Sequence, residues 1–244
     1  MMIITNPPYS GSLHLKILSE AMKHSDDVVN LSPIKWRNPR ALFDGNAASS
    51  IIKDYSEIFN NLSDLVVIDS ETAVDMFGTY DSNDLGIYHI TKDGPHKAFS
   101  DFINEPLAVK LLKSNVKFLS LVTTVLPTTD EFYRMPTIYG NENKEWLKKI
   151  RSPDFERYYK LDKGQKHCRP YVNFKTKEEC ENFHKYLGLK LPRYLNFKCR
   201  FGANVSQDAI PFLPDYTHPW TDQMLYDYFG LTDDEIKTIE KEIK

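Results

Sequence analysis

The segment Thr5-Asn6-Pro7-Pro8-Tyr9-Ser10 constrains the fold most, because two consecutive prolines interrupt both strands and helices. It follows the apolar run Met2-Ile3-Ile4 and precedes an amphipathic stretch that opens at Ser12. A short β-rich run, a rigid proline turn and a helix are the order in which open α/β sheets place reactive groups at the carboxyl end of a strand. The sequence therefore predicts a functional site at this turn. The plainer alternative is a strand-to-helix connection with Ser12 as the helix cap.

The side chains of this turn suit one kind of ligand, a flat base with an exocyclic amine. The prolines fix φ at about −65° and remove two backbone donors, which leaves the Pro7 carbonyl as a bare acceptor beside the Asn6 side chain. An amine that donates its hydrogens to two fixed acceptors keeps electron density on its nitrogen. Tyr9 adds an aromatic face on which an extruded nucleobase could stack.

Asn6-Pro7-Pro8-Tyr9 resembles the Asn/Asp-Pro-Pro-Tyr/Phe motif of the DNA amino-methyltransferases, which transfer a methyl group from S-adenosylmethionine to adenine or cytosine. Tyrosine in the fourth place is most similar to the adenine-specific enzymes. The resemblance implies base flipping, with Asn6 and the Pro7 carbonyl accepting from the amine, Pro8 holding the turn and Tyr9 stacking on the ring. These four residues are the predicted catalytic residues.

The first 92 residues have the pattern of alternating strands and helices. The predicted strands are 2–4, 28–31, 65–69 and 85–91, and the predicted helices are 13–23, 47–59 and 72–77. With their crossovers, these elements imply a sheet that is covered on both faces. Their order is similar to the second half of a methyltransferase Rossmann-like sheet, which begins with the catalytic strand and ends in an antiparallel pair.

Three further segments extend the resemblance to fused restriction-modification methylases. They are Pro33-Ile34-Lys35-Trp36, Asp75-Met76-Phe77 and Gly86-Ile87-Tyr88. The first belongs to an exposed-looking loop, 34–40. We predict that Lys35, Trp36 and Arg37 in this loop contact the extruded nucleotide or adjacent phosphates.

The cofactor part of the resemblance is incomplete. Adenine enzymes of this order bind S-adenosylmethionine through a strand and a glycine-rich turn that precede the Pro-Pro turn, whereas five residues precede Asn6 here. The nearest downstream fragments, 42–46, 77–79 and 201–204, each lack an apolar strand followed by two suitably spaced glycines. We therefore expect the S-adenosylmethionine site to be incomplete in this chain. Either a second chain supplies the cofactor-binding strands, or the protein has lost methyl transfer.

Charge changes along the chain, with a net −6 over 1–96, +9 over 97–200 and −6 over 201–244. A basic middle suits a polyanion such as double-stranded DNA, and a solvated charged surface is the alternative. Lys148, Lys149, Arg151 and Arg157 interleave with aromatic residues and are the predicted DNA contacts of this region. A helix face with snorkelling lysines would have the same pattern.

The last third also resembles the end of the target-recognition region of these methylases. Its features are a strand at 171–174, the capping box Thr176-Lys177-Glu178-Glu179, the segment 193–198, the run Pro219-Trp220-Thr221-Asp222 and the cap Thr232-Asp233-Asp234-Glu235. We predict an α/β protein with a partial Rossmann-like methyltransferase sheet in a catalytic half-domain, 1–95. An α+β target-recognition domain follows, 96–244.

Composition sets the cellular context. A chain of 244 residues with 41% hydrophobic residues can bury a sizeable core, and no stretch approaches the roughly 18 apolar residues of a membrane span. Without a signal-peptide pattern, we expect a cytoplasmic protein with no membrane partner. Its three cysteines lack Cys-x-x-Cys spacing, so no metal is predicted. The alternative metal site would combine His167, Cys168, Cys180 and His184.

These patterns predict a site-specific DNA adenine-N6 methyltransferase that depends on S-adenosylmethionine, as one part of a split enzyme. The main alternative is a non-catalytic DNA-binding or decoy protein built on the same scaffold. A nucleotide-binding protein unrelated to DNA is a third interpretation.

Overall fold

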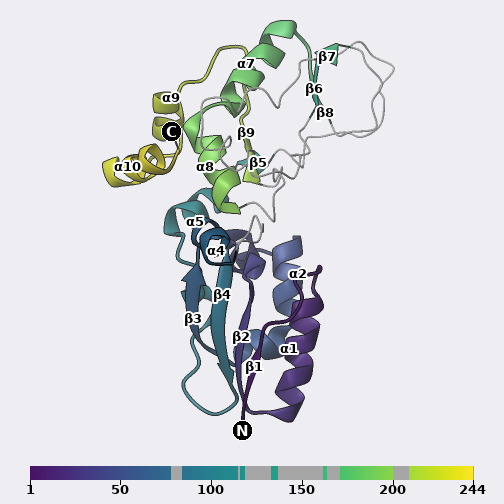
Figure 1. The fold of residues 1–244 in the computed structure, drawn as a ribbon. Coiled ribbons are helices and arrows are strands. Elements are labelled where there is room, and N and C mark those ends of the chain that lie inside the picture. Colours follow the sequence, from purple (N-terminus) through teal and green to yellow (C-terminus); the bar gives the residue numbers. More distant parts are fainter. Residues whose placement is uncertain are drawn as a thin grey trace. The chain divides into compact units, whose positions relative to one another are not determined.

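The chain divides into two compact units, Met1–Pro106 and Leu107–Lys244 (Figure 1). The computed structural model describes residues 1–77, 84–114, 116–118, 133–136, 162–163, 171–199 and 209–243, and of 70–71, 133–136, 162–163 and 171–173 it describes the backbone alone. The boundary between the units lies after Pro106, whereas the sequence analysis placed it near residue 95. The two units are described separately below and are called unit 1 and unit 2.

Unit 1 contains the strands and helices that periodicity predicts. Its strands are β1 (Met2–Thr5), β2 (Asp27–Pro33), β3 (Leu62–Ile68) and β4 (Leu85–Thr91). Its helices are α1 (Leu13–His24), α2 (Ala47–Asp54), α3 (Ser56–Asn60) and α4 (Ser70–Phe77), with short 3-10 turns η1 (Lys35–Arg37), η2 (Pro39–Leu42) and η3 (Phe99–Phe102). The single helix predicted over 47–59 is two helices, because the chain leaves helical geometry at Tyr55.

The four strands form one mixed sheet in the order β1-β2-β4-β3. β1 pairs parallel to β2, and β4 pairs antiparallel to both β2 and β3. β1, β2 and β3 therefore run in the same direction, and their carboxyl ends lie at the same end of the sheet. The protein is α/β with a mixed sheet, as predicted at this level.

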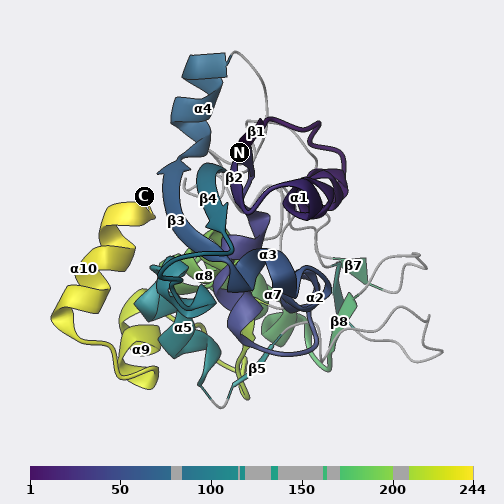
Figure 2. The same ribbon diagram turned by 90° about the horizontal axis from the view of Figure 1, so that it is seen from below.

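One face of this sheet is covered by α1, α2 and α3, which lie on the same side of it (Figure 2). The crossovers from β1 to β2 and from β2 to β3 progress in the same direction across the sheet. Right-handed crossovers in one direction place their helices on one face. The core beneath them contains Leu15, Leu18, Trp36, Phe59, Leu62, Tyr88 and Ile90.

The opposite face is largely uncovered, so the prediction of a sheet covered on both faces is wrong. Strand pairing places two rows on this side, Ile4-Val29-His89-Asp64 and Leu31-Ile87-Val66. Ile4 is 75% exposed, Val66 56%, Met2 54% and Ile87 40%. The error arises because both crossovers run the same way, which the order of elements did not reveal. We call this surface, which includes Met2, Ile4, Val29, Val66 and Ile87, the open face.

Unit 2 is built around helices and short antiparallel strand pairs. Its helices are α5 (Pro106–Leu112), α7 (Lys177–Leu187), α8 (Lys190–Cys199), α9 (Asp222–Tyr228) and α10 (Asp233–Glu242). Its strands are β5 (Lys117–Phe118), β6 (Tyr133–Pro136), β7 (Asp162–Lys163), β8 (Tyr171–Phe174) and β9 (Pro211–Phe212), in two sheets ordered β5-β9 and β7-β6-β8. The described core is an aromatic cluster in which Phe183 contacts Phe174, Tyr186, Phe212 and Tyr216.

The predicted capping boxes of unit 2 are confirmed. Thr176 Oγ1 accepts from the Glu179 backbone N–H at 3.1 Å, and the Glu179 carboxylate accepts in return from the Thr176 N–H at 3.1 Å. Thr232 and Glu235 make the same reciprocal pair at the start of α10. Such caps depend on residues three apart in sequence, which is why local patterns identify them.

Candidate functional site

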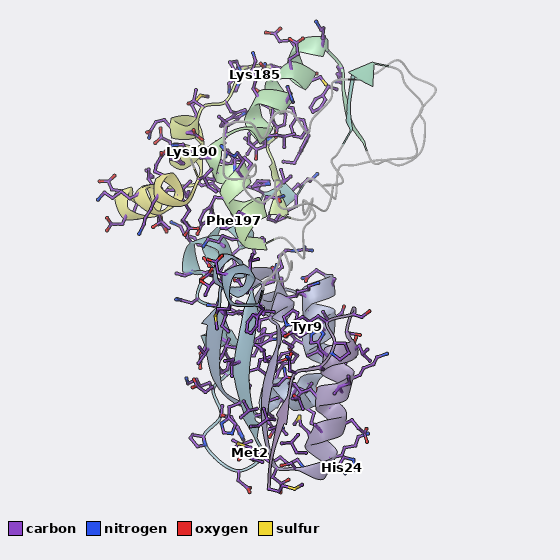
Figure 3. All side chains as sticks on the ribbon, viewed as in Figure 1. Met2, Tyr9, His24, Lys185, Lys190 and Phe197 are labelled. Atoms are coloured by element: carbon purple, nitrogen blue, oxygen red, sulfur yellow. The ribbon has the colours of Figure 1, made fainter. Side chains whose placement is uncertain are left out.

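The Asn6-Pro7-Pro8-Tyr9 turn lies directly after β1, at the edge where the three co-directional strands end. Figure 3 shows Tyr9 and Met2 at opposite ends of this strand. Asn6 and Pro8 are exposed, Pro7 is buried and Tyr9 is half-buried. Gly11 follows with φ of 55°, a left-handed conformation that lets the chain turn into α1. Ser12 occupies the N-cap position of α1, but its side chain makes no cap hydrogen bond.

Tyr9 folds back onto the turn. Its hydroxyl donates to Asn6 Oδ1 at 2.8 Å and lies 3.4 Å from the Leu31 carbonyl oxygen. Its ring packs against the cluster of Ile68, Ala73 and Leu85. The Asn6 acceptor that a substrate amine needs is therefore engaged by Tyr9, whereas the Pro7 carbonyl accepts no hydrogen bond from the described part of the chain.

A chain of buried hydrogen bonds runs from β1 across β2 to β4 beside this turn. Thr5 Oγ1 donates to Asn30 Oδ1 at 2.7 Å, Asn30 Nδ2 donates to Ser32 Oγ at 2.8 Å, and Ser32 Oγ lies 2.6 Å from the Tyr88 hydroxyl. Asn30, Ser32 and Tyr88 are fully buried. Burial raises the pKa of Tyr88, so its hydroxyl remains a neutral partner in this chain.

This polar chain anchors Thr5, the residue before Asn6, and sequence reasoning did not find it. Asn30 and Ser32 alternate with apolar residues in β2, so both side chains point to the same face. The sequence did contain a signal for this network: two polar residues, two positions apart, on the covered face of a short apolar strand. Buried polar groups need partners, and that requirement predicts a network.

The segment Lys35-Trp36-Arg37 does not present its indole to solvent, contrary to prediction. Trp36 is 1% exposed, and its ring centroid lies 5.0 Å from that of Phe59 and 5.8 Å from that of Tyr88. Arg37 Nε donates to the Phe102 carbonyl at 2.6 Å, while Lys35 is half-exposed. A large aromatic ring stabilises a protein when it is buried, so Trp36 contributes to the stability of unit 1.

Several predicted residues lie outside the described residues. These are Lys148, Lys149, Arg151 and Arg157 of the basic region, and His167 and Cys168 of the alternative metal site. Cys180 is buried in α7, which raises the pKa of its thiol to about 12, so it remains protonated at neutral pH. Within the described ranges, no three His, Cys, Asp or Glu side chains gather closely enough to hold a metal ion.

The residues that the structure describes do not fit S-adenosylmethionine in the way the resemblance implies. Gly45, with φ of 82°, precedes α2, but it follows the 3-10 turn η2 rather than a strand. The other two glycine fragments, Gly78 and Gly202, lie outside the described residues. In the described part of the chain, no strand therefore leads through a glycine-rich turn into a helix.

A second polar cluster lies at the other end of the sheet and extends onto the open face. His89 on β4 bonds through Nε2 to Asp27 on β2, and its Nδ1 lies 2.9 Å from Ser63 Oγ on β3. Ser63 also donates to the His89 carbonyl at 3.1 Å and occupies the irregular position between Leu62 and Asp64, where the β3–β4 pairing shifts. These bonds join three strands, and Asp27 and His89 lie on the open face itself, since Asp27 pairs with Met2 and His89 with Val29.

Comparisons of the chain with family models, with curated proteins and with solved structures found no match. Within the described residues, every helix is too short or too polar to cross a membrane.

Proposed function

We propose that this chain is the base-binding part of an S-adenosylmethionine-dependent DNA adenine-N6 methyltransferase. One observation carries the proposal. The Asn6-Pro7-Pro8-Tyr9 turn lies at the carboxyl end of β1, the first strand of a sheet that ends in the antiparallel strands β4 and β3. Both the motif and its place in the sheet agree with what the resemblance to the amino-methyltransferases implies.

In this proposal the turn holds the amine of an extruded adenine. The exposed Asn6 amide and the Pro7 carbonyl accept its two hydrogens, and the proline pair keeps both acceptors in place. Asn6 Oδ1 accepts from Tyr9 through one lone pair and offers its other lone pair to the amine, while the Tyr9 ring stacks on the base. The chain's own residues thus orient the amine, and the methyl donor is bound elsewhere.

The remaining assignments follow from the same proposal. Unit 1 is the catalytic half of a Rossmann-like methyltransferase sheet, and unit 2 is an α+β target-recognition domain that holds double-stranded DNA through the basic region 97–200. The protein works in the cytoplasm as part of a restriction-modification system.

A specific observation also favours the alternative, a non-catalytic DNA-binding or decoy protein. The hydrogen bond from Tyr9 uses one of the two lone pairs of Asn6 Oδ1, the acceptor on which catalysis depends. A turn retained for folding alone would have the same internal bond. It would bind adenine no better than purine, which has a hydrogen atom in place of the exocyclic amine.

The test uses the purified chain and two DNA duplexes that differ in one unpaired base. One carries a bulged adenine and the other a bulged purine, which lacks the exocyclic amine. A good base contact contributes about 1–3 kcal/mol, so we expect adenine to be bound roughly 5- to 150-fold more tightly. Asn6→Ala should remove this preference and retain the affinity for DNA, whereas the exposed Asn60→Ala at the end of α3 should retain both.

Equal binding of the two duplexes by the unsubstituted chain would contradict the enzyme proposal and favour the alternative. Calorimetric titration with S-adenosylmethionine completes the test. We expect no binding by the isolated chain, and micromolar binding would mean that this chain holds a complete cofactor site.

A further inference from the structure

We infer that the Tyr9 hydroxyl orients the Asn6 carboxamide for bidentate recognition of the base, in which Oδ1 accepts from the exocyclic amine and Nδ2 donates to the neighbouring ring nitrogen. This inference deepens the proposed function and rests on it. It gives Tyr9 a positioning role besides stacking. It also narrows the substrate to a base whose amine adjoins a ring nitrogen with a free lone pair, as the amine of adenine adjoins N1 and lies beside N7.

The backbone at Asn6 is held from both sides in the sequence. Thr5, the preceding residue, donates to Asn30 Oδ1 at 2.7 Å, and Asn30 belongs to the buried network that ends at the Tyr88 hydroxyl. Pro7, the following residue, is buried and has a fixed φ. Little backbone freedom therefore remains at Asn6, and the direction of its carboxamide depends on its side-chain torsions.

The Tyr9 hydroxyl restricts those torsions. It has one hydrogen to donate and two oxygen acceptors nearby, Asn6 Oδ1 at 2.8 Å and the Leu31 carbonyl at 3.4 Å. The shorter distance lies in the ordinary range of an O–H···O bond and the longer one lies outside it, so the hydrogen goes to Asn6. The Tyr9 ring packs against the cluster on Ile68, which holds the hydroxyl in place. This bond fixes Oδ1, and with it the plane in which Nδ2 lies.

The rest of the carboxamide is available to a ligand. Asn6 is exposed, and its Nδ2 donates to no residue that the structure describes. Tyr9 uses one lone pair of Oδ1, and the other remains. An acceptor and a donor side by side in one plane match an amine hydrogen and the adjacent ring nitrogen, which is how asparagine binds adenine bidentately. The Pro7 carbonyl then accepts the second amine hydrogen.

The donor on Asn6 distinguishes this arrangement from simple acceptance of the amine. An aspartate carboxylate would accept from the amine as well as asparagine does, but it has no hydrogen to donate. Its second oxygen would face the lone pair of the ring nitrogen and repel it. Asn6→Asp is therefore the decisive substitution, because it retains the shape of the side chain and the acceptor for Tyr9 and removes only the donor.

The experiment measures binding of the purified chain to duplexes with one bulged base. The base is adenine, 1-deazaadenine, in which C–H replaces N1, or 7-deazaadenine, in which C–H replaces N7. We expect adenine to be bound roughly 5- to 150-fold more tightly than one of the two deaza bases, the one that lacks the nitrogen bound by Nδ2. Asn6→Asp should remove this preference and retain the preference for adenine over purine.

Tyr9→Phe tests the positioning role, since it retains the ring and removes the hydroxyl. It should reduce the preference for adenine over that deaza base by about 2- to 12-fold, the effect of one hydrogen bond. Tyr55→Phe, at the end of α2, is the matched control and should leave the preference unchanged. Unchanged affinity for a fully paired duplex would show that each variant is folded.

Equal binding of adenine and both deaza bases, by a chain that prefers adenine to purine, would overturn the inference and leave the proposed function standing. Loss of affinity with both deaza bases would also overturn it, because one carboxamide cannot bind N1 and N7 at once. Full preference in Tyr9→Phe, or in Asn6→Asp, would have the same meaning. Failure of the proposed function itself would appear separately, as equal binding of the adenine and purine duplexes.

Discussion

The described residues of unit 1 and unit 2 differ in how completely their apolar side chains are buried. Among the described side chains, the large exposed hydrophobics of unit 1 are Met1, Met2, Ile4, Leu13, Leu42, Val66, Val67, Met76, Phe77 and Ile87, whereas those of unit 2 are Met224 and Tyr228. In the described part of unit 2, the aromatic cluster on Phe183 packs with residues of α5, α7, α8, α9 and α10. In unit 1, three helices cover one face of a sheet and leave the other open. A helical core can close on itself, but a sheet has two faces and needs two layers.

The comparison predicts that each unit depends on its own aromatic core. Trp36→Ala should destabilise unit 1 by about 3–5 kcal/mol, because it leaves a cavity between Phe59 and Tyr88. Hydrogen exchange should then be faster in β2 and β4 and unchanged in α7. Phe183→Ala is the matched change in unit 2 and should have the reverse pattern. If either substitution exposed amides of both units equally, the division into two cores would be wrong.

A smaller effect is expected at Gly86 on β4, where the sheet of unit 1 leaves no room for a side chain. A Cβ added at Gly86 would collide with Ile34 Cγ2 and would lie 2.8 Å from Leu65 Cδ1. Gly86→Ala should therefore lower the unfolding free energy of unit 1 by about 1–3 kcal/mol, measured by urea denaturation. Ile34→Ala removes one colliding side chain, so the double substitution should cost less than the sum of the two single ones. Full additivity would show that the space at Gly86 is not limiting.

The unfolding free energy of unit 2 should depend on pH through Glu235. The hydrogen bond from Lys110 Nζ, followed by that from the Thr232 backbone N–H, holds the pKa of Glu235 below its ordinary 4.5. A carboxylate with a lowered pKa stabilises the fold above that ordinary value and loses its contribution as the pH falls through the folded-state pKa. Both side chains are partly exposed, so the contribution is about 0.5–1 kcal/mol. Denaturation of the unsubstituted chain and Glu235→Gln should show a larger difference in unfolding free energy at pH 6 than at pH 3.

The smallest effect is expected on the open face. Ile4→Ser should change the unfolding free energy of unit 1 by less than about 0.5 kcal/mol, because Ile4 is already largely in water. Leu18→Ser, at a fully buried position of α1, is the control and should destabilise unit 1 strongly. A large loss of stability on Ile4→Ser would mean that this face is covered in solution.

Local sequence patterns predicted the elements that depend on neighbours in the chain. The strand, proline turn and helix around Asn6 have the predicted order, and the caps at Thr176 and Thr232 follow from residues three positions away. Such features need no knowledge of what packs against them.

The features that depend on distant residues were predicted less well. Trp36 lies in a segment with two cations, which suggested exposure, yet rings from α3, β4 and η3 enclose it. The network on Asn30 joins residues up to 56 positions apart in sequence. The open face follows from the direction of two crossovers, which element order alone does not specify. The role of Asn6 stays a prediction, since the structure provides its position and not its ligand.

The hydrogen bond from Thr5 to Asn30 has a consequence for pairing register. β1 is a four-residue edge strand, and short edge strands slide easily against a neighbour. A slip of one residue would move Asn6 by about 3.3 Å along the strand and turn Thr5 away from its buried partner. The misregistered state would leave Asn30 with an unsatisfied buried acceptor, at a cost of about 1–3 kcal/mol. The position of the exposed asparagine is thus selected during folding by the hydroxyl of the preceding residue, Thr5, through its bond to a neighbouring strand.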